Sequence, residues 1–159
     1  MTPQKNSARQ ALYSQIDALR TSLPEGDLLY TAGRLVPVQF HRFDSQKLGA
    51  VLIGGSVIVV NSARPLPCQR FSLAHELVHY FLHRGMESHK NPFLEWQANE
   101  GAAELLLPHR EVLAMAAAHR STMGTLPRLL ARRFGVSETV ARYKLQSLGL
   151  SCQSKSIDA

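Results

Sequence analysis

The stretch RFSLAHELVHYFLHR, Arg70–Arg84, decides both the fold and the chemistry that this sequence predicts. It places His75, His79 and His83 at intervals of four residues, with Glu76 directly after the first histidine. On an α-helix, residues four apart are rotated by only about 40°, so His75 and His79 project side by side. Two imidazoles in that arrangement can ligate one Zn²⁺ at roughly 2.0–2.1 Å each. The spacing therefore predicts a helix that carries part of a metal site.

Glu76 adds a general base to this helix. It lies about 100° around the helix from His75, beside the pair of histidines rather than behind it. It can therefore take a proton from a water molecule at the metal without ligating the metal itself, which is the physical content of the H-E-x-x-H motif. Leu77, Val78 and Phe81 supply an apolar face opposite the histidines, as expected for a packed helix. The alternative is a surface helix that is merely rich in histidine.

A hydrolytic zinc ion needs a third protein ligand and one position left for water. His83 continues the ladder, but three histidines along one straight helix span about 12 Å, too far to meet at one ion. We expect His83 to support a liganding imidazole, to face the substrate or to be solvated. Glu95 is the better third ligand, because small residues follow it in EWQANEGAAELLLP and would let the two helices pack closely. Asn99, one turn later, is placed to hydrogen-bond a liganding imidazole.

Other polar residues near this site are alternatives or surface groups. His89 and Cys68 are the runner-up candidates for the third ligand. Glu104 is rotated about 180° from Glu95, so it is expected at the surface. Glu100 is expected on a solvated face as well.

The composition is that of a globular protein. The 159 residues, of which 45% are hydrophobic and 19% charged, suit one compact domain and exclude a disordered chain. The longest apolar run, AVLIGGSVIVV, contains glycines and is shorter than the roughly 20 residues of a membrane helix. The first residues have no apolar stretch of the signal-peptide type. We therefore expect a cytoplasmic protein with no membrane partner, in which Cys68 and Cys152 are free thiols.

Periodicity and turn signals predict an α+β fold. An amphipathic helix is expected from about Ser7, and the strand-like runs RLVPVQF, GAVLI and SVIVVN follow it. Gly54-Gly55 separates two of these runs, as in a β-hairpin. The SVIVVN strand is either an interior strand or one that binds an extended peptide along its edge.

The second half of the chain is predicted to be helical. The histidine helix is expected to be capped near Ser72, the next helix to run from about Phe93 until Pro108, and a third over 109–120. Two short helices then surround Gly135, with Ser137 as a cap for the second. The expected domains are a core over 1–108, a basic helical subdomain over 109–150 and a loose tail over 151–159.

Together, the segments RFSLAHELVHYFLH and EWQANEGAAELLLP resemble the ImmA/IrrE family of metallopeptidases. The family pattern is an R-F-[ST]-x-A-H-E-x-x-H helix followed by E-x-x-A-N-x-[FG]-A-A-x-L-L-x-P. The resemblance implies that His75, His79 and Glu95 hold zinc and that Glu76 is the base, in a gluzincin-like site similar to that of thermolysin. It also implies a small zincin-like core, with a short antiparallel sheet plus helices.

At two positions the chain carries a residue other than the one most common in the family. Val78 stands where glycine is common, and Gly101 stands where an aromatic residue is common. Both departures would change packing and pocket shape, but neither removes a functional group.

The resemblance implies cleavage of a helix-turn-helix repressor encoded nearby, which relieves repression of a mobile element or a stress response. The segment 109–145 carries seven Lys or Arg against two Glu, and LARRFGVSETVARYKLQSLGL has helix-turn-helix spacing from Ala131 to Gly135. Few of its side chains could read bases, so a scaffold role or docking of a repressor is favoured over direct DNA binding. The alternative function is a non-catalytic regulator with a structural metal site, which binds DNA or a repressor through these basic helices.

Overall fold

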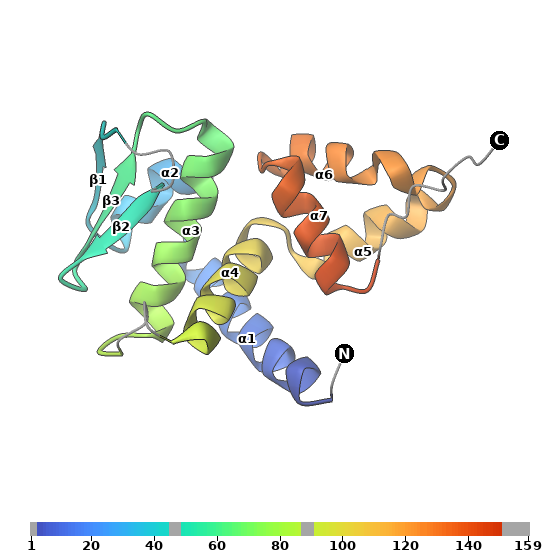
Figure 1. The fold of residues 1–159 in the computed structure, drawn as a ribbon, viewed down its shortest axis with the longest axis horizontal. Coiled ribbons are helices and arrows are strands. Elements are labelled where there is room, and N and C mark those ends of the chain that lie inside the picture. Colours follow the sequence, from blue (N-terminus) through green and yellow to red (C-terminus); the bar gives the residue numbers. More distant parts are fainter. Residues whose placement is uncertain (1–2, 45–48, 87–90, 151–159) are drawn as a thin grey trace. The chain divides into compact units, whose positions relative to one another are not determined.

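The computed structural model describes residues 3–44, 49–86 and 91–150, which have an α+β fold (Figure 1). The chain divides into two compact units, Met1–Leu106 and Leu107–Ala159. The first unit contains all the residues predicted to hold the metal, and it is described first. Among the described residues, no helix is both long and apolar enough to cross a membrane.

The first unit opens with the long helix α1, Pro3–Ser22. Its apolar positions Leu12, Ile16 and Leu19 are buried in the core of the unit, as their helical spacing predicts. The helix begins at Pro3 and not near Ser7 as predicted, because the first turn of a helix accommodates a proline without losing a hydrogen bond.

A short helical segment that the sequence analysis missed connects α1 to the sheet. It consists of α2, Leu28–Thr31, and the 3₁₀ turn η1, Ala32–Arg34. The carboxylate of Asp27 caps α2 by accepting a hydrogen bond from the backbone N–H of Leu29 at 3.1 Å. The same carboxylate pairs with the guanidinium of Arg70, which lowers the pKa of Asp27.

The sheet within the described residues has the strand order β1-β3-β2. The strands are β1 Val38–His41, β2 Ala50–Ile53 and β3 Val57–Asn61. The antiparallel β2–β3 hairpin turns at Gly54 and Gly55, whose φ angles of 56° and 66° favour glycine, so the predicted hairpin is confirmed. β1 pairs with β3 in parallel. The sheet is therefore mixed, whereas an antiparallel sheet was expected.

The middle position of β3 corrects a second expectation. Both edges of β3 are paired, one with β1 and the other with β2. An extended peptide therefore cannot add to the SVIVVN strand, and the interpretation of that strand as a peptide-binding edge was wrong. The interior-strand alternative is the correct one.

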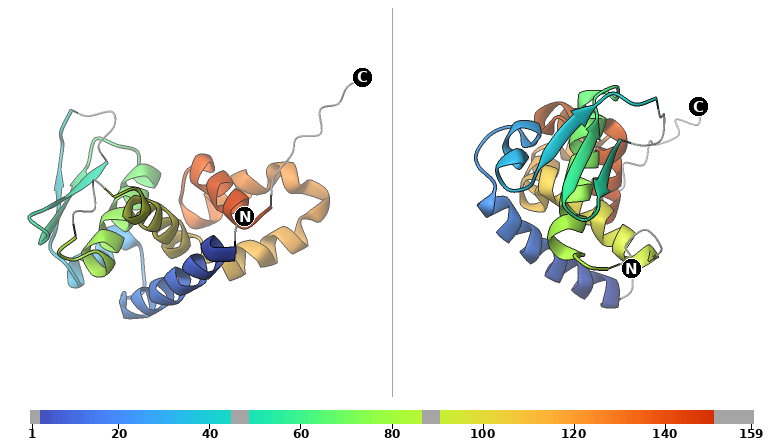
Figure 2. Two further views of the ribbon diagram at one scale, coloured as in Figure 1. Left: turned by 60° about the horizontal axis from the view of Figure 1, so that its bottom comes forward. Right: turned by 90° about the vertical axis from the view of Figure 1, so that its left-hand side faces the viewer.

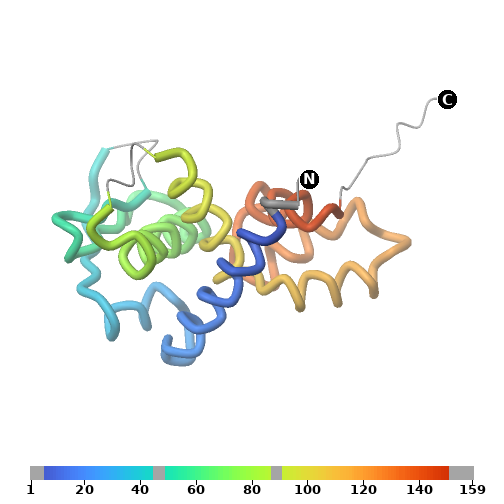
Figure 3. The backbone as a smooth tube through the Cα atoms, turned by 90° about the horizontal axis from the view of Figure 1, so that it is seen from below, coloured from blue at the N-terminus to red at the C-terminus, as the bar shows by residue number. Residues whose placement is uncertain are grey.

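Two helices carry the predicted site, α3 Leu66–Leu82 and α4 Pro92–Leu106. α3 packs on β2 and β3, and Figure 2 (right) looks onto the sheet with α3 behind it. α4 packs on α3, and α1 packs on α4; Figure 3 traces the chain through these elements. α3 begins at Leu66 and not near Ser72, because Pro65 and Pro67 fit the start of a helix.

The close approach of α3 and α4 depends on Gly101. A Cβ atom at this position would lie 3.0 Å from Cγ2 of Val78 and 3.1 Å from Cδ1 of Ile16. The absence of a side chain at Gly101 therefore leaves room for the branched side chain of Val78 on the facing helix. The two positions that depart from the family pattern are thus in contact with each other.

The described residues of the second unit form helices joined by short turns. Its elements are α5 His109–Ala118, η3 Arg120–Thr125, α6 Leu126–Phe134 and α7 Glu138–Ser147. Gly135, with φ of 65°, ends α6, and the hydroxyl of Ser137 caps α7 by accepting from the N–H of Val140. Both features agree with the predicted turn and cap.

Candidate metal centre

Three potential metal donors from two helices converge in the first unit. Nε2 of His75 and Nε2 of His79 lie 3.1 Å apart on α3. The carboxylate of Glu95 on α4 places Oε1 3.2 Å from Nε2 of His79 and Oε2 3.5 Å from Nε2 of His75. Within the described residues this is the only set of three His, Cys, Asp or Glu donors close enough to share an ion.

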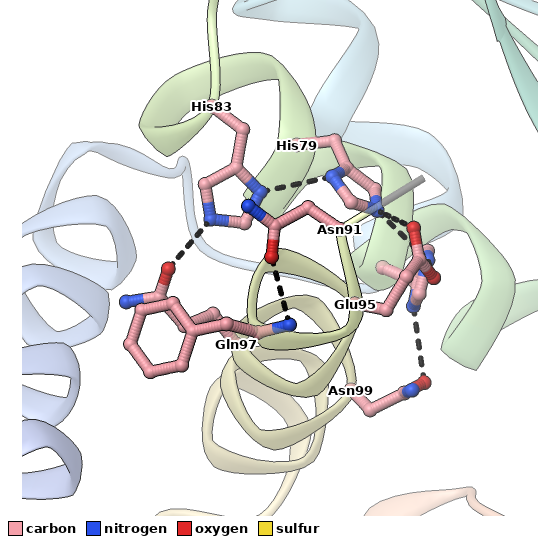
Figure 4. A network of polar contacts seen from close by, with 8 residues as sticks. His79, His83, Asn91, Glu95, Gln97 and Asn99 are labelled. Atoms are coloured by element: carbon pink, nitrogen blue, oxygen red, sulfur yellow. Dashed lines mark hydrogen bonds and ion pairs between the residues drawn. The ribbon is translucent and has the colours of Figure 1, made fainter. Parts of the chain in front are cut away.

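The local sequence explains how Glu95 reaches the two histidines. The side chain of Asn91 accepts a hydrogen bond from the N–H of Phe93 at 3.0 Å, and Pro92 takes the first helical position. This cap starts α4 just before Glu95, so the carboxylate projects from the first turn of the helix. In Figure 4, Glu95 points from α4 toward His79.

The donor set fits zinc in both chemistry and spacing. Two imidazole nitrogens and one carboxylate oxygen are typical ligands of a catalytic zinc ion, and ligands roughly 2.0–2.1 Å from a tetrahedral ion lie about 3.3 Å from one another. The two imidazole nitrogens lie 3.1 Å apart, and each has its own nearest oxygen of Glu95, Oε1 at 3.2 Å from His79 and Oε2 at 3.5 Å from His75, so these separations are close to that value. Oε1 of Glu95 is buried, and no hydrogen bond from the described residues reaches it, so a cation would satisfy it.

Asn99 lies where the sequence analysis expected it. Its Oδ1 is 3.1 Å from Nδ1 of His75, a contact drawn as the dashed line that begins at Asn99 in Figure 4. An amide oxygen can only accept a hydrogen bond, so Nδ1 of His75 carries the hydrogen and Nε2 keeps its lone pair. The lone pair of His75 is therefore directed to the place where the other donors meet.

His83 is buried, with an exposed fraction of 4%. Its Nδ1 is 2.9 Å from Nδ1 of His79, and its Nε2 is 3.2 Å from Oε1 of Gln97. Burial lowers the pKa of His83, while the hydrogen bond to Gln97 and the charge of Glu95 partly oppose this effect. Of the three expectations for His83, the burial excludes a solvated side chain, and its contacts place it behind the imidazole of His79.

Gln97 was not predicted to belong to this site. This residue is two positions after Glu95, so it points to a different side of α4 and has no motif of its own. The only sign of such a residue in the sequence was His83, which had no assigned partner. A buried imidazole needs a hydrogen-bond partner for each ring nitrogen.

Glu76 lies beside the donor cluster with an exposed fraction of 7%. Burial raises the pKa of Glu76 from its usual 4.5 to about 7; the negative charge of Glu95 acts in the same direction, and a hydrogen bond from the backbone of Leu52 opposes it. Oε2 of Glu76 is buried without a hydrogen-bond partner in the described part of the chain. This carboxylate is therefore held near the metal donors with an oxygen available for a proton.

The raised pKa predicts a pH-dependent stability of the metal-free protein. Because the folded-state pKa of about 7 exceeds the usual 4.5, the native state holds a proton on Glu76 that the unfolded chain releases between these pH values. The contribution of Glu76 to stability is complete below about pH 4.5 and is lost as the pH rises through 7. At roughly 1.4 kcal/mol per pKa unit, the loss is about 3 kcal/mol.

Urea unfolding of the metal-free protein between pH 5 and pH 8 measures this effect. Glu76→Gln should remove it, so the stability difference between variant and native protein should grow in favour of the variant as the pH rises. Parallel pH profiles for the two proteins would show that Glu76 titrates normally.

Two glutamates expected at the surface are fully buried, so those predictions were wrong. Glu100 and Glu104 on α4 each have an exposed fraction of 0%. Oε1 of Glu100 accepts hydrogen bonds from the hydroxyl of Tyr13 at 2.6 Å and from Nε of Arg9 at 2.9 Å. Glu104 faces Arg20, whose Nη2 lies 3.6 Å from its Oε1. The guanidinium groups and the tyrosine hydroxyl of α1 therefore compensate the negative charges of both buried carboxylates.

The remaining candidates do not join the donor cluster. Cys68, a free thiol in the first turn of α3, is not part of it. His89, like the second cysteine Cys152, lies outside the described residues. The guanidinium of Arg70 pairs with Asp27 and is not part of the cluster either.

Comparisons with known proteins place this site in a family. A search of curated proteins finds no match for the chain. A family model described as Peptidase_M78, IrrE N-terminal-like domain, matches residues 28–146, which include α2, the sheet and every residue of the donor cluster. The match covers most of the chain and agrees with the resemblance that the two motif segments carry. The chain therefore belongs to the ImmA/IrrE family of metallopeptidases.

Proposed function

We propose that the protein is a zinc-dependent endopeptidase in which His75, His79 and Glu95 hold the metal and Glu76 is the general base. The observation that carries the proposal is the convergence of three zinc-type donors beside a buried carboxylate with a raised pKa. A structural zinc site closes its coordination with four protein ligands, whereas three ligands leave a position for water. The donor set described here has three.

The chemistry follows from these residues. A bound zinc ion would act as a Lewis acid on the scissile carbonyl and lower the pKa of water at the site. Glu76 takes the proton of the attacking water and returns it to the leaving amine. Asn99 fixes the ring of His75, and the burial of Glu76 keeps bulk water from competing for its free oxygen.

We also propose that the substrate binds along the outer edge of β2. The N–H of Asn61 donates a hydrogen bond to the carbonyl of Gly49, which fixes which residues of β2 bond to β3. In an antiparallel pair only alternate residues bond to the neighbouring strand. Ala50 and Leu52 are the others, so their backbone N–H and C=O groups point to the outer edge of the sheet. The hydrogen bond from Leu52 to Glu76 brings this edge to the base. A peptide extended along β2 would carry its scissile bond past Glu76.

The proposed substrate is a helix-turn-helix repressor in the cytoplasm, which the family resemblance supports. The second unit offers a basic surface on which such a protein could dock. The charge pattern favours a protein partner over DNA, because Arg133 and Arg142 lie within 3.5 Å of Glu111 and Glu138, which partly neutralise them. Lys144 on α7 is fully buried, so it does not contribute to this surface.

A cleavage assay tests the proposal. The zinc-loaded protein is incubated with the helix-turn-helix protein of the adjacent gene, and intact-mass analysis follows the products. We expect one discrete cut that a chelator abolishes and that zinc restores. His79→Ala is the matched control and should be inactive at equal concentration. Absence of any cut with added zinc would contradict the substrate assignment, and cleavage by the control would contradict the metal assignment.

A further inference from the structure

The contacts of His83 set the direction of a chain of hydrogen bonds that ends at the metal donors. Oε1 of Gln97, 3.2 Å from Nε2 of His83, can only accept a hydrogen bond, so Nε2 of His83 carries the hydrogen. A neutral imidazole with a hydrogen on Nε2 has a lone pair on Nδ1. That lone pair faces Nδ1 of His79 at 2.9 Å, so Nδ1 of His79 must be the donor.

This direction determines which nitrogen of His79 is available to a metal. With its hydrogen on Nδ1, His79 keeps the lone pair on Nε2, the nitrogen that faces His75 and Glu95. The reverse direction would place a hydrogen on Nε2 of His79 and exclude it as a ligand. Figure 4 shows the chain from Gln97 through His83 to His79.

The two liganding histidines are thus oriented by two amides of the same helix. Asn99 reaches His75 directly, whereas Gln97 reaches His79 only through the ring of His83. His79 lies one helical turn after His75 on α3. The amide of Gln97 bonds to His83 and not to His79, so His83 is needed to connect that amide to His79.

We propose that His83 is a positioning residue that, with Gln97, holds His79 in the tautomer able to bind metal. The inference rests on the proposed function for its zinc ion, but the direction of the hydrogen bond between His79 and His83 can be observed separately from zinc binding. His83 touches neither the substrate nor the ion in this role.

Two substitutions separate positioning from simple packing. His83→Phe keeps a ring of similar size but removes the acceptor, whereas His83→Asn loses volume but places an amide oxygen near the position of Nδ1. A positioning role predicts that His83→Phe weakens zinc affinity by about 10–100-fold and that His83→Asn recovers most of it. If His83 only fills space, the order of the zinc affinities should be reversed, and the affinity of the phenylalanine variant should be close to that of the native protein.

Competition of each protein with a chromophoric chelator gives zinc affinity, and thermal melting of the metal-free proteins shows that each variant folds. If His83→Phe does not fold, Gln97→Leu takes its place, with an expected loss of about 3–10-fold because His83 then lacks its fixed acceptor. Native-like zinc affinity in the folded phenylalanine or leucine variant would overturn the proposal.

Long-range ¹H–¹⁵N spectra of the metal-free protein provide a second readout. We expect a hydrogen on Nδ1 of His79 and on Nε2 of His83, and a mixture of His79 tautomers in Gln97→Leu. A hydrogen on Nδ1 of His83, with none on Nδ1 of His79, would reverse the direction of this hydrogen bond and overturn the proposal. Failure of the native protein to bind zinc would instead refute the proposed function, and the spectra would still decide the tautomer.

Discussion

Replacing Glu76 by glutamine is expected to lower the rate of peptide cleavage by about 10²–10⁴-fold while the protein still binds one zinc ion. Glutamine has nearly the shape of glutamate but cannot take a proton from water at neutral pH. The three donors His75, His79 and Glu95 do not include Glu76, so the metal affinity should stay close to native. The measurements are the cleavage rate under saturating zinc and the zinc content after dialysis.

Glu25→Gln is the matched control for this prediction. It makes the same chemical change at an exposed carboxylate of the first unit that lies outside the donor cluster, and it should leave the rate unchanged. Native-like cleavage by Glu76→Gln would show that another group is the base. Loss of zinc from Glu76→Gln would show that the carboxylate is a ligand, and the non-catalytic alternative predicts that biological function persists in this variant.

The second large effect, a loss of folding stability, is expected from substitutions at the contact between α3 and α4. Val78→Gly removes a buried side chain and adds a helix-interior glycine, which should destabilise the protein by about 3 kcal/mol. Gly101→Phe places a ring where even a Cβ atom would lie 3.0 Å from Val78, so a loss of at least about 3 kcal/mol is expected. Urea unfolding of the metal-free proteins measures both losses.

The double variant tests whether the two departures from the family pattern compensate each other. Combined, Val78→Gly and Gly101→Phe restore a small residue on α3 opposite a large one on α4. We expect the loss of stability in the double variant to be smaller than the sum of the two single losses by about 1–3 kcal/mol. Ile16 limits this gain, because it also lies close to position 101. Strictly additive losses would mean that the two positions are independent despite their contact.

The parts of the site that could be predicted were those fixed by spacing within one helix. His75, Glu76 and His79 follow from helical geometry alone, because four residues return the chain to the same face. Glu95 was harder to place, since its position depends on how two helices pack. Small residues along α4 indicated a close approach, and in the structure Gly101 faces Val78 directly.

The errors arose where a residue's partner is distant in sequence. Glu100 and Glu104 looked like surface residues because glutamate is seldom buried without a partner, and their partners on α1 are more than eighty residues away. The parallel pairing of β1 with β3 is another long-range feature, which alternation along one strand cannot reveal. His83 needed the position of Gln97 before its role could be inferred.

X-ray absorption spectroscopy at the zinc edge, combined with zinc-anomalous diffraction, tests the central claim most directly. One zinc ion per chain should be bound by two imidazole nitrogens and a carboxylate oxygen at about 2.0–2.2 Å, with the anomalous peak between His75, His79 and Glu95. A sulfur ligand, a zinc ion at another place in the chain, or a carboxyl of Glu95 turned away from the metal would contradict the account.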